Sequence, residues 1–177
     1  WVGTDDGNVQ ITRNAGATWT NVGENLPGVN NEVWVNRIEP SHHAASTAYV
    51  VLDNHRFDDM DPHVYKTTDF GASFTDITSN LPTGIGSYVV LEDPVNPNLL
   101  FVGTEYGAFA SVTGGADWFK LSTGMPNVAV RDMLIHPRDA DLVAGTHGRS
   151  IWILDDITPL RQMTSEVTSA DAYLFKN

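Results

Sequence analysis

The sequence predicts an all-β fold built from a repeated antiparallel unit of four short strands. Three observations lead to this expectation: a motif that occurs three times, short runs of β-branched and aromatic residues between turn residues, and no sustained 3.6-residue hydrophobic period. The chain has 177 residues, 41% of them hydrophobic, with Gly 15 and Pro 9. This composition suffices for a hydrophobic core and is typical of a fold with many turns.

The repeated motif occurs at residues 12–19, 67–74 and 111–118 and reads Ser/Thr-x-Asp/Asn/Thr-x-Gly-x-Ser/Thr/Asp-Trp/Phe. Glycine in a tight hairpin adopts positive φ without steric cost, and Asp or Asn two residues earlier can bond backbone N–H groups inside the turn. We therefore interpret the motif as a folding device. The residues given this structural role are Asn14, Gly16, Trp19, Asp69, Gly71, Phe74, Gly115 and Trp118.

The motif predicts two further details. Its final aromatic residue is expected to begin the fourth strand and to pack between neighbouring units. The first copy has Asn14 where Asp is usual, and the third has Thr113 there, so these two turns are expected to be capped less well than the second.

Strand and turn composition divides each unit into four strands. In the second unit the strands are expected at residues 33–39, 48–52, 63–67 and 73–77. The last unit shows three, at 130–136, 142–146 and 150–154, and no motif follows them. Four strands in about 40–55 residues are typical of a propeller blade. The predicted fold is a β-propeller fragment of about three and a half four-stranded antiparallel blades.

This prediction sets the domain organisation. Residues 1–156 are expected to form the partial propeller, and 157–177 an exit segment that is at most partly helical. The blades are expected near residues 1–30, 31–85, 86–128 and 129–156, the first and last being incomplete. Because such an arc has two open strand edges, we expect its partner to be the remainder of its own propeller or a second copy.

The repeats resemble the Asp-box, or BNR, repeat of sialidases, xyloglucanase-type glycoside hydrolases and the VPS10 (sortilin) domain. The likeness includes large exported bacterial BNR-repeat proteins, whose last blades carry segments similar to residues 55–59 and 145–156. It covers roughly residues 1–160. It implies Asp-box hairpins and a secreted, periplasmic or cell-surface location.

The strand order also predicts which loops share a face. In an up-and-down blade, the turns between strands two and three lie at the opposite end from the repeat turns. We call this end the loop face; it comprises the turns at residues 5–6, 53–63, 105–106 and 147–149. Loops at the opening of a ring commonly bind ligands. The candidate ligand-binding residues are Asp5, Arg56, Tyr106, His147 and Arg149.

Two functions remain open for this face. A recognition module would bind a protein, peptide or glycan there. A glycoside hydrolase would need two carboxylates about 5–10 Å apart, and Asp6, Asp58, Asp59 and Glu105 are the candidates. A sialidase is disfavoured, because Arg56 and Arg149 are the only arginines that we expect on this face.

No cofactor is predicted. The loop that holds His55, Asp58, Asp61 and His63 is the candidate for a Ca²⁺ or other divalent site, but its spacing matches neither an EF-hand nor a zinc motif. With 22 acidic against 10 basic residues, the net charge of -12 disfavours nucleic acid and a photosystem-assembly-type propeller with a basic face. No apolar run is long enough for a membrane span, and the chain has no cysteine.

Overall fold

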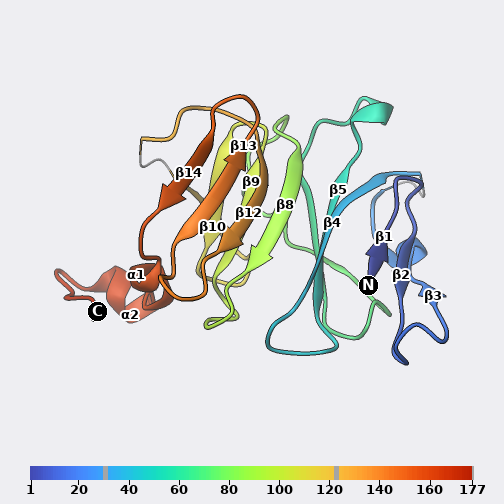
Figure 1. The fold of residues 1–177 in the computed structure, drawn as a ribbon, viewed down its shortest axis with the longest axis horizontal. Coiled ribbons are helices and arrows are strands. Elements are labelled where there is room, and N and C mark those ends of the chain that lie inside the picture. Colours follow the sequence, from blue (N-terminus) through green and yellow to red (C-terminus); the bar gives the residue numbers. More distant parts are fainter. Residues whose placement is uncertain (30–31, 122–123, 177) are drawn as a thin grey trace.

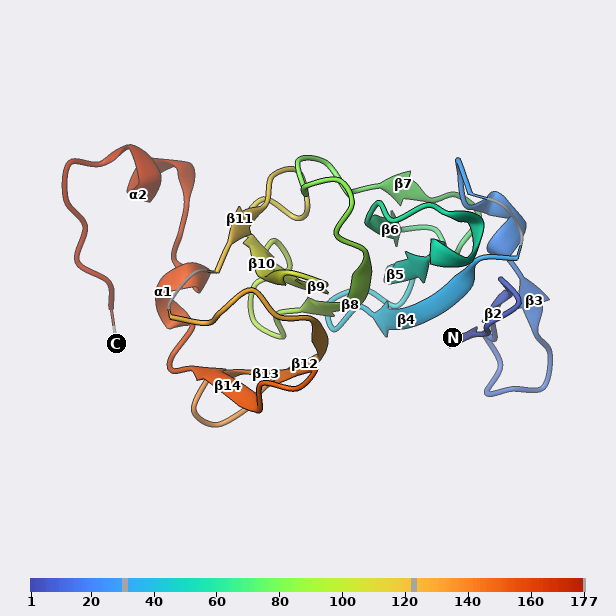
Figure 2. The same ribbon diagram turned by 90° about the horizontal axis from the view of Figure 1, so that it is seen from above.

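The computed structural model describes residues 1–29, 32–121 and 124–176, and it confirms the predicted all-β propeller architecture. Its strands form four antiparallel sheets that follow one another along the molecule as blades (Figure 1). Figure 2 shows β4, β8 and β12 beginning the second, third and fourth blades, with β7 and β11 at the opposite edges of the second and third.

Within each sheet, the strands pair in chain order. The first sheet contains β1 (Val2–Gly3), β2 (Val9–Ile11) and β3 (Thr20–Asn21). The second contains β4 (Trp34–Pro40), β5 (Ala48–Asp53), β6 (His63–Thr67) and β7 (Thr75–Asp76). The third contains β8 (Ser87–Glu92), β9 (Leu100–Thr104), β10 (Gly107–Ser111) and β11 (Phe119–Lys120). The fourth contains β12 (Val130–Ile135), β13 (Leu142–Thr146) and β14 (Ile151–Leu154).

Helices are short. Two 3₁₀ turns, η1 (Gly23–Asn25) and η2 (His55–Phe57), lie in connections, and α1 (Thr158–Arg161) and α2 (Ser165–Ser169) follow the last strand. None of the helices in the described part of the chain is long and apolar enough to cross a membrane. The expected boundary between the first two blades, at residues 30 and 31, lies outside the described residues, as does residue 177 of the expected exit segment.

The core lies between successive sheets as three apolar layers. Strands β9 and β10 are buried at every position because a sheet covers each of their faces. In β14, by contrast, Ile151 and Ile153 are exposed while Trp152 and Leu154 pack on the third sheet. Burial on both faces explains why the middle strands read as continuous apolar runs.

The three repeat turns share one hydrogen-bond plan. In the second copy, Thr67 Oγ1 accepts a bond from Gly71 N at 2.9 Å, and Asp69 Oδ1 accepts one from Ser73 N at 2.9 Å. Gly71 has φ +83°, in the region that favours glycine. The predicted capping role therefore holds, and the hydroxyl of the first motif residue adds a bond that sequence reasoning did not assign.

The expectation of weaker capping was wrong for the first turn. Asn14 Oδ1 accepts from Thr18 N at 2.9 Å and its amide donates to Thr18 Oγ1 at 2.8 Å, because an amide offers both an acceptor and a donor. In the third turn, Thr113 Oγ1 accepts from Asp117 N at 3.0 Å. A hydroxyl donates as well as accepts, and Thr113 Oγ1 also donates to Asp117 O at 3.5 Å and contacts Ser111 Oγ at 3.2 Å. The third turn therefore has as many side-chain bonds as the second, and the expectation of weaker capping was wrong here too.

The motif aromatics follow the packing prediction in the second and third blades but not in the first. Phe74 and Trp118 are 8% and 5% exposed, and Trp118 Nε1 donates to Ile77 O of the preceding blade at 2.8 Å. Trp19 is 46% exposed. The physical reason is that the motif aromatic packs on the blade before it, and no described residues form a blade before the first.

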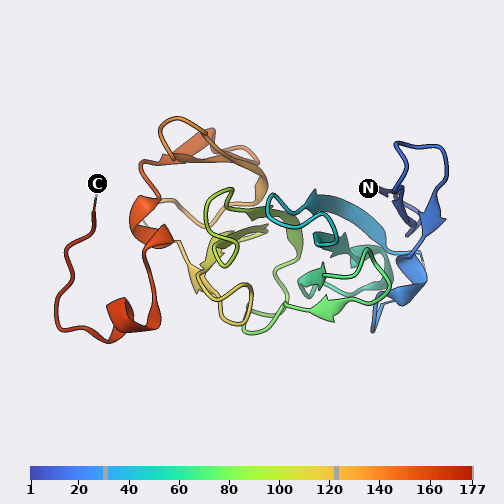
Figure 3. The ribbon, with the colours of Figure 1, turned by 90° about the horizontal axis from the view of Figure 1, so that it is seen from below.

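The segment after β14 is anchored to the third and fourth blades. Ile157 is buried in their shared core, and Arg161 of α1 forms a bidentate ion pair with the fully buried Asp93, with Nη2 2.7 Å from Oδ1. Figure 3 shows α1 beside these blades and the rest of the segment extending away from them.

Candidate functional site

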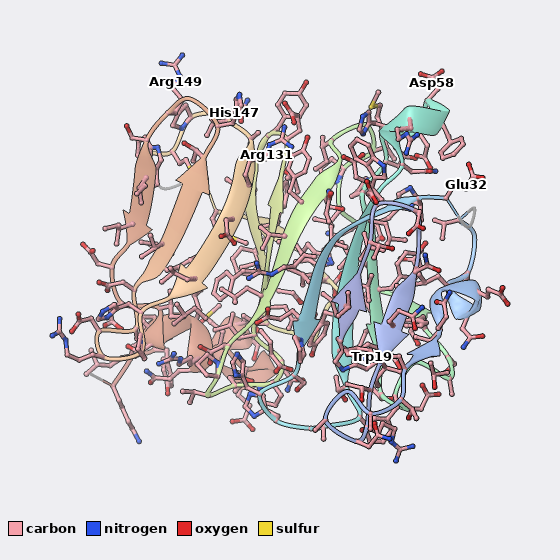
Figure 4. The ribbon with its side chains drawn as sticks, turned by 45° about the vertical axis from the view of Figure 1, so that its right-hand side comes forward. Trp19, Glu32, Asp58, Arg131, His147 and Arg149 are labelled. Carbon is pink, nitrogen blue, oxygen red and sulfur yellow. The ribbon has the colours of Figure 1, made fainter. Side chains whose placement is uncertain are left out.

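The loop face carries the candidate residues at one end of the blades. In Figure 4, Asp58, Arg131, His147 and Arg149 lie at this end, and Trp19 lies toward the other. Alternation of turns in an up-and-down sheet produces this separation. Arg131 also lies here, so the expectation that only Arg56 and Arg149 fall on this face was wrong.

A cleft of about 430 Å³ opens on the loop face between the second and third blades. This volume falls in the range of about 300–1,000 Å³ that is usual for ligand pockets. Its lining comprises Asp53, His55, Asp59, Met60, Asp61, Gly84, Ile85, Gly86, Tyr88, Glu105, Tyr106 and Arg131. The cleft thus unites candidate residues from the 53–63 loop and the 105–106 turn with residues from the starts of β8 and β12.

Backbone hydrogen bonds fix the cleft walls. Gly86 N donates to Met60 O at 2.8 Å, and Gly84 N donates to Asp61 Oδ1 at 2.8 Å, which ties the 53–63 loop to the connection before β8. Glu105 N donates to Ile85 O at 2.9 Å, which ties the β9–β10 turn to the same connection. The walls are therefore formed before any ligand binds.

Tyr88, Glu105 and Arg131 form a linked group at the end of the cleft. The Tyr88 hydroxyl donates to Glu105 Oε2, and the Arg131 guanidinium lies 3.6 Å above the Tyr88 ring, with Nη2 3.7 Å from the same carboxylate oxygen. Burial, followed by the hydrogen bond to Glu105, raises the pKa of Tyr88 to about 12. The hydroxyl therefore remains a proton donor to Glu105 at neutral pH.

Sequence reasoning missed Tyr88 and Arg131 because both lie in strands, β8 and β12, and not in the turns from which the candidates were drawn. The pairing of β8 with β9 shifts register between Ser87 and Val89, and that of β12 with β13 shifts between Val130 and Asp132. Tyr88 and Arg131 are the residues skipped. Such bulges redirect a side chain out of the strand alternation. A bulge depends on how a strand pairs with its neighbour in the sheet. The residues around Tyr88 and Arg131 therefore carry no local signal for it.

The 53–63 loop is held by its own polar contacts. Asp59 accepts from Asn54 Nδ2 at 2.8 Å and from Asp61 N at 3.1 Å, and it contacts His63 Nε2 at 2.8 Å. Burial by itself would raise the pKa of Asp59, but these hydrogen bonds outweigh it and lower the pKa. Asp53 Oδ1 holds the loop in a similar way, 2.6 Å from His55 Nδ1.

No metal centre is evident within the described residues, which contain no group of three or more His, Asp or Glu side chains placed to hold an ion. Of the metal candidates, His63 contacts Asp59 and His55 contacts Asp53, while Asp61 binds the backbone of Gly84. Asp58 lies at the tip of the same loop, at the end of η2.

The remaining candidates lie outside the cleft lining. Asp6 accepts bonds from Thr4 and Asn8 within its own turn, and these lower its pKa. The neighbouring Asp5 is exposed. The Arg56 guanidinium lies 5.2 Å from the centre of the Trp34 ring. His147 and Arg149 are exposed in the β13–β14 turn.

Comparison with solved structures identifies the architecture. The crystal structure of the Niastella koreensis GH74 enzyme matches with a TM-score of 0.62 and 19% identity, over 86% of this chain and 26% of that one. The GH74 xyloglucanase of Xanthomonas campestris matches with a TM-score of 0.67 and 16% identity, over 87% and 27%. The structure described as YCF48 bound to D1 peptide matches with a TM-score of 0.61 and 17% identity, over 87% and 47%.

These four blades share the β-propeller fold of those proteins. The identities are low, so the likeness shows the fold alone. The chain spans about a quarter to a half of the length of the structures it matches. No protein-family model and no curated protein sequence matches it.

Charge distinguishes the two walls of the propeller cleft. The lining contains four carboxylates, Asp53, Asp59, Asp61 and Glu105, and one guanidinium, Arg131. Arg131 lies next to Glu105, whereas the three aspartates lie in the 53–63 loop, where their polar contacts are histidine rings, an amide and backbone N–H groups. The cleft can therefore accept hydrogen-bond donors and positive charge along the wall formed by the second blade.

Proposed function

We propose that this chain is part of a recognition module that binds a peptide segment in the cleft on the loop face of a β-propeller. The observation that carries the proposal is the cleft itself, with walls fixed by backbone bonds and polar groups placed beside exposed apolar ones. A preformed site avoids much of the ordering cost of binding.

Two exposed side chains give the cleft an apolar rim. Tyr106 is 49% exposed and Met60 is 50% exposed, and they come from neighbouring blades. An aromatic ring with a polar tip contributes contact area at little cost in conformational entropy, and methionine adapts to varied partners. Both properties suit the side chains and backbone amides of a peptide.

The test compares peptide and glycan arrays with the protein and with Tyr106→Ala. We expect peptide binding that weakens about tenfold or more in this variant, the range seen when an aromatic anchor is truncated. Phe119→Ala is the matched control, because Phe119 is 40% exposed but lies on β11, outside the cleft. Unchanged binding by Tyr106→Ala would place the site elsewhere, and binding of glycans alone would replace the peptide as ligand.

A glycoside hydrolase is the second candidate, because carboxylates of two blades, Asp59 and Glu105, line the same cleft. The lowered pKa of Asp59 suits a nucleophile or base rather than a general acid. Glu105 accepts a hydrogen bond from the Tyr88 hydroxyl and lies 3.7 Å from Arg131 Nη2. A catalytic acid would need a raised pKa, and Glu39, where burial raises it, lies toward the other end of β4, next to His42.

Hydrolysis assays test this second candidate directly. Aryl-glycosides and xyloglucan would be incubated with the protein and with Glu105→Gln. We expect no turnover by either. Turnover that disappears in Glu105→Gln would make this propeller an enzyme and overturn the recognition proposal.

A further inference from the structure

We propose that the cleft selects a lysine or arginine side chain of the bound peptide; this inference rests on the recognition function proposed above. The positive group would lie against the aspartates of the 53–63 loop, and its aliphatic stem against Tyr106 and Met60.

The aspartates retain acceptor capacity after holding the loop. Asp61 uses Oδ1 for Gly84 N, and Asp53 uses Oδ1 for the backbone and ring of His55. Within the described residues, Oδ2 of both Asp53 and Asp61 accepts no hydrogen bond. Each carboxylate thus keeps an oxygen for a donor that enters the cleft, and bonds from charged donors are the stronger kind.

Arg131 does not neutralise this wall. Its guanidinium lies over Tyr88 and its nearest carboxylate is Glu105, at 3.7 Å. Four carboxylates face one arginine in the lining, so three negative charges remain formally unbalanced there. The net charge of -12 adds a long-range field of the same sign. A cationic group is therefore attracted both from a distance and at contact.

The apolar rim matches the shape of a long cationic side chain. Lysine and arginine place an aliphatic stem on apolar surface while the charged head stays at a polar site. Tyr106 and Met60 are half exposed at the mouth of the cleft, and the aspartates lie in the same lining. The Tyr106 ring also offers a face for a cation. An acidic side chain would meet repulsion in the same place.

The experiment measures binding of capped peptides that are identical except for one position, which is Lys, Arg, Gln or Glu, flanked by the best residues from the peptide array. We expect Lys and Arg peptides to bind more tightly than the Gln peptide, the Glu peptide to bind least, and the preference to fall as salt is raised from 50 to 500 mM. Asp61→Asn, which keeps the oxygen that accepts from Gly84, should weaken binding of the Lys peptide about fivefold.

Arg131→Gln supplies a readout that mere structural damage would not give. Removing this positive charge should tighten binding of the Lys peptide about fivefold and weaken binding of the Glu peptide. Asp117→Asn is the matched control for Asp61→Asn, because it changes the net charge by the same amount and sign, and Asp117 lies in a repeat turn at the other end of the third blade. It should leave the Lys preference unchanged.

The outcomes separate this inference from the function on which it rests. If the peptides bind equally well whatever the varied residue, recognition stands and the charge selection is refuted. If Arg131→Gln weakens the Lys and Glu peptides alike, the charge argument also fails. If no member of the series or of the array binds, the recognition function itself is wrong.

Discussion

Substituting Gly71 by alanine tests how the repeat turns join one blade to the next. The new Cβ would lie 2.7 Å from Val22 Cγ2 and 3.0 Å from Val22 Cβ of the first blade, closer than carbon atoms pack. The backbone φ of +83° adds strain of about 1 kcal/mol for a residue with a Cβ. Overpacking typically costs about 1–3 kcal/mol. We therefore expect a loss of about 2–4 kcal/mol in the free energy of unfolding.

Gly16→Ala is the control that separates these two terms. Gly16 occupies the same motif position with φ +90°, and its Cβ would meet nothing closer than Trp19 at 3.9 Å. It should cost only the conformational part, about 1 kcal/mol. Urea unfolding followed by tryptophan fluorescence measures both variants. Equal losses in Gly16→Ala and Gly71→Ala would refute the packing argument, and no loss in either would refute the conformational one as well.

Three other predictions concern single contacts. Trp118→Phe should lower stability by about 1–2 kcal/mol by removing its bond to the preceding blade, whereas Trp19→Phe should change it by less than about 0.5 kcal/mol; thermal melts compare them. Arg161→Met leaves the buried Asp93 unpaired, so we expect a loss of about 3–5 kcal/mol and faster proteolysis after residue 157. Hydrogen bonds within its own turn lower the pKa of Asp69 from 3.8, so the stabilisation that this carboxylate contributes is present above that pH and is lost as the pH falls through the lowered pKa. Asp69→Asn should therefore flatten the acidic part of the curve of unfolding free energy against pH. An unchanged acidic part would contradict this.

Local signals in the sequence were sufficient for the blades. The expected strands at residues 63–67 and 142–146 coincide with β6 and β13, and the fourth unit has the three strands predicted for it. The outer strand expected at 73–77 is shorter, because Phe74 turns into the core between blades before the ladder begins at Thr75. Strand propensity and turn chemistry act over a few residues, so sequence reports them well.

The candidate site was predicted only in part. Glu105 and Tyr106 were placed on the correct face because turn alternation follows from strand order. Their partners Tyr88 and Arg131 were not, because a bulge depends on the register between two strands. His147 and Arg149 were grouped with them on the same face, yet the structure leaves them outside the cleft lining.

The sequence by itself determined the repeat, the turn geometry and the end of each blade at which every loop lies, since these depend on residues close together in the chain. Only the tertiary structure decided which side chains meet. Trp19 and Trp118 occupy the same motif position, yet one is half exposed and the other buried, because burial depends on the blade packed in front of each. Likewise, the cleft exists because residues 53–61, 84–88, 105–106 and 131 converge from three blades. Such contacts are set by how sheets stack, which no local pattern encodes.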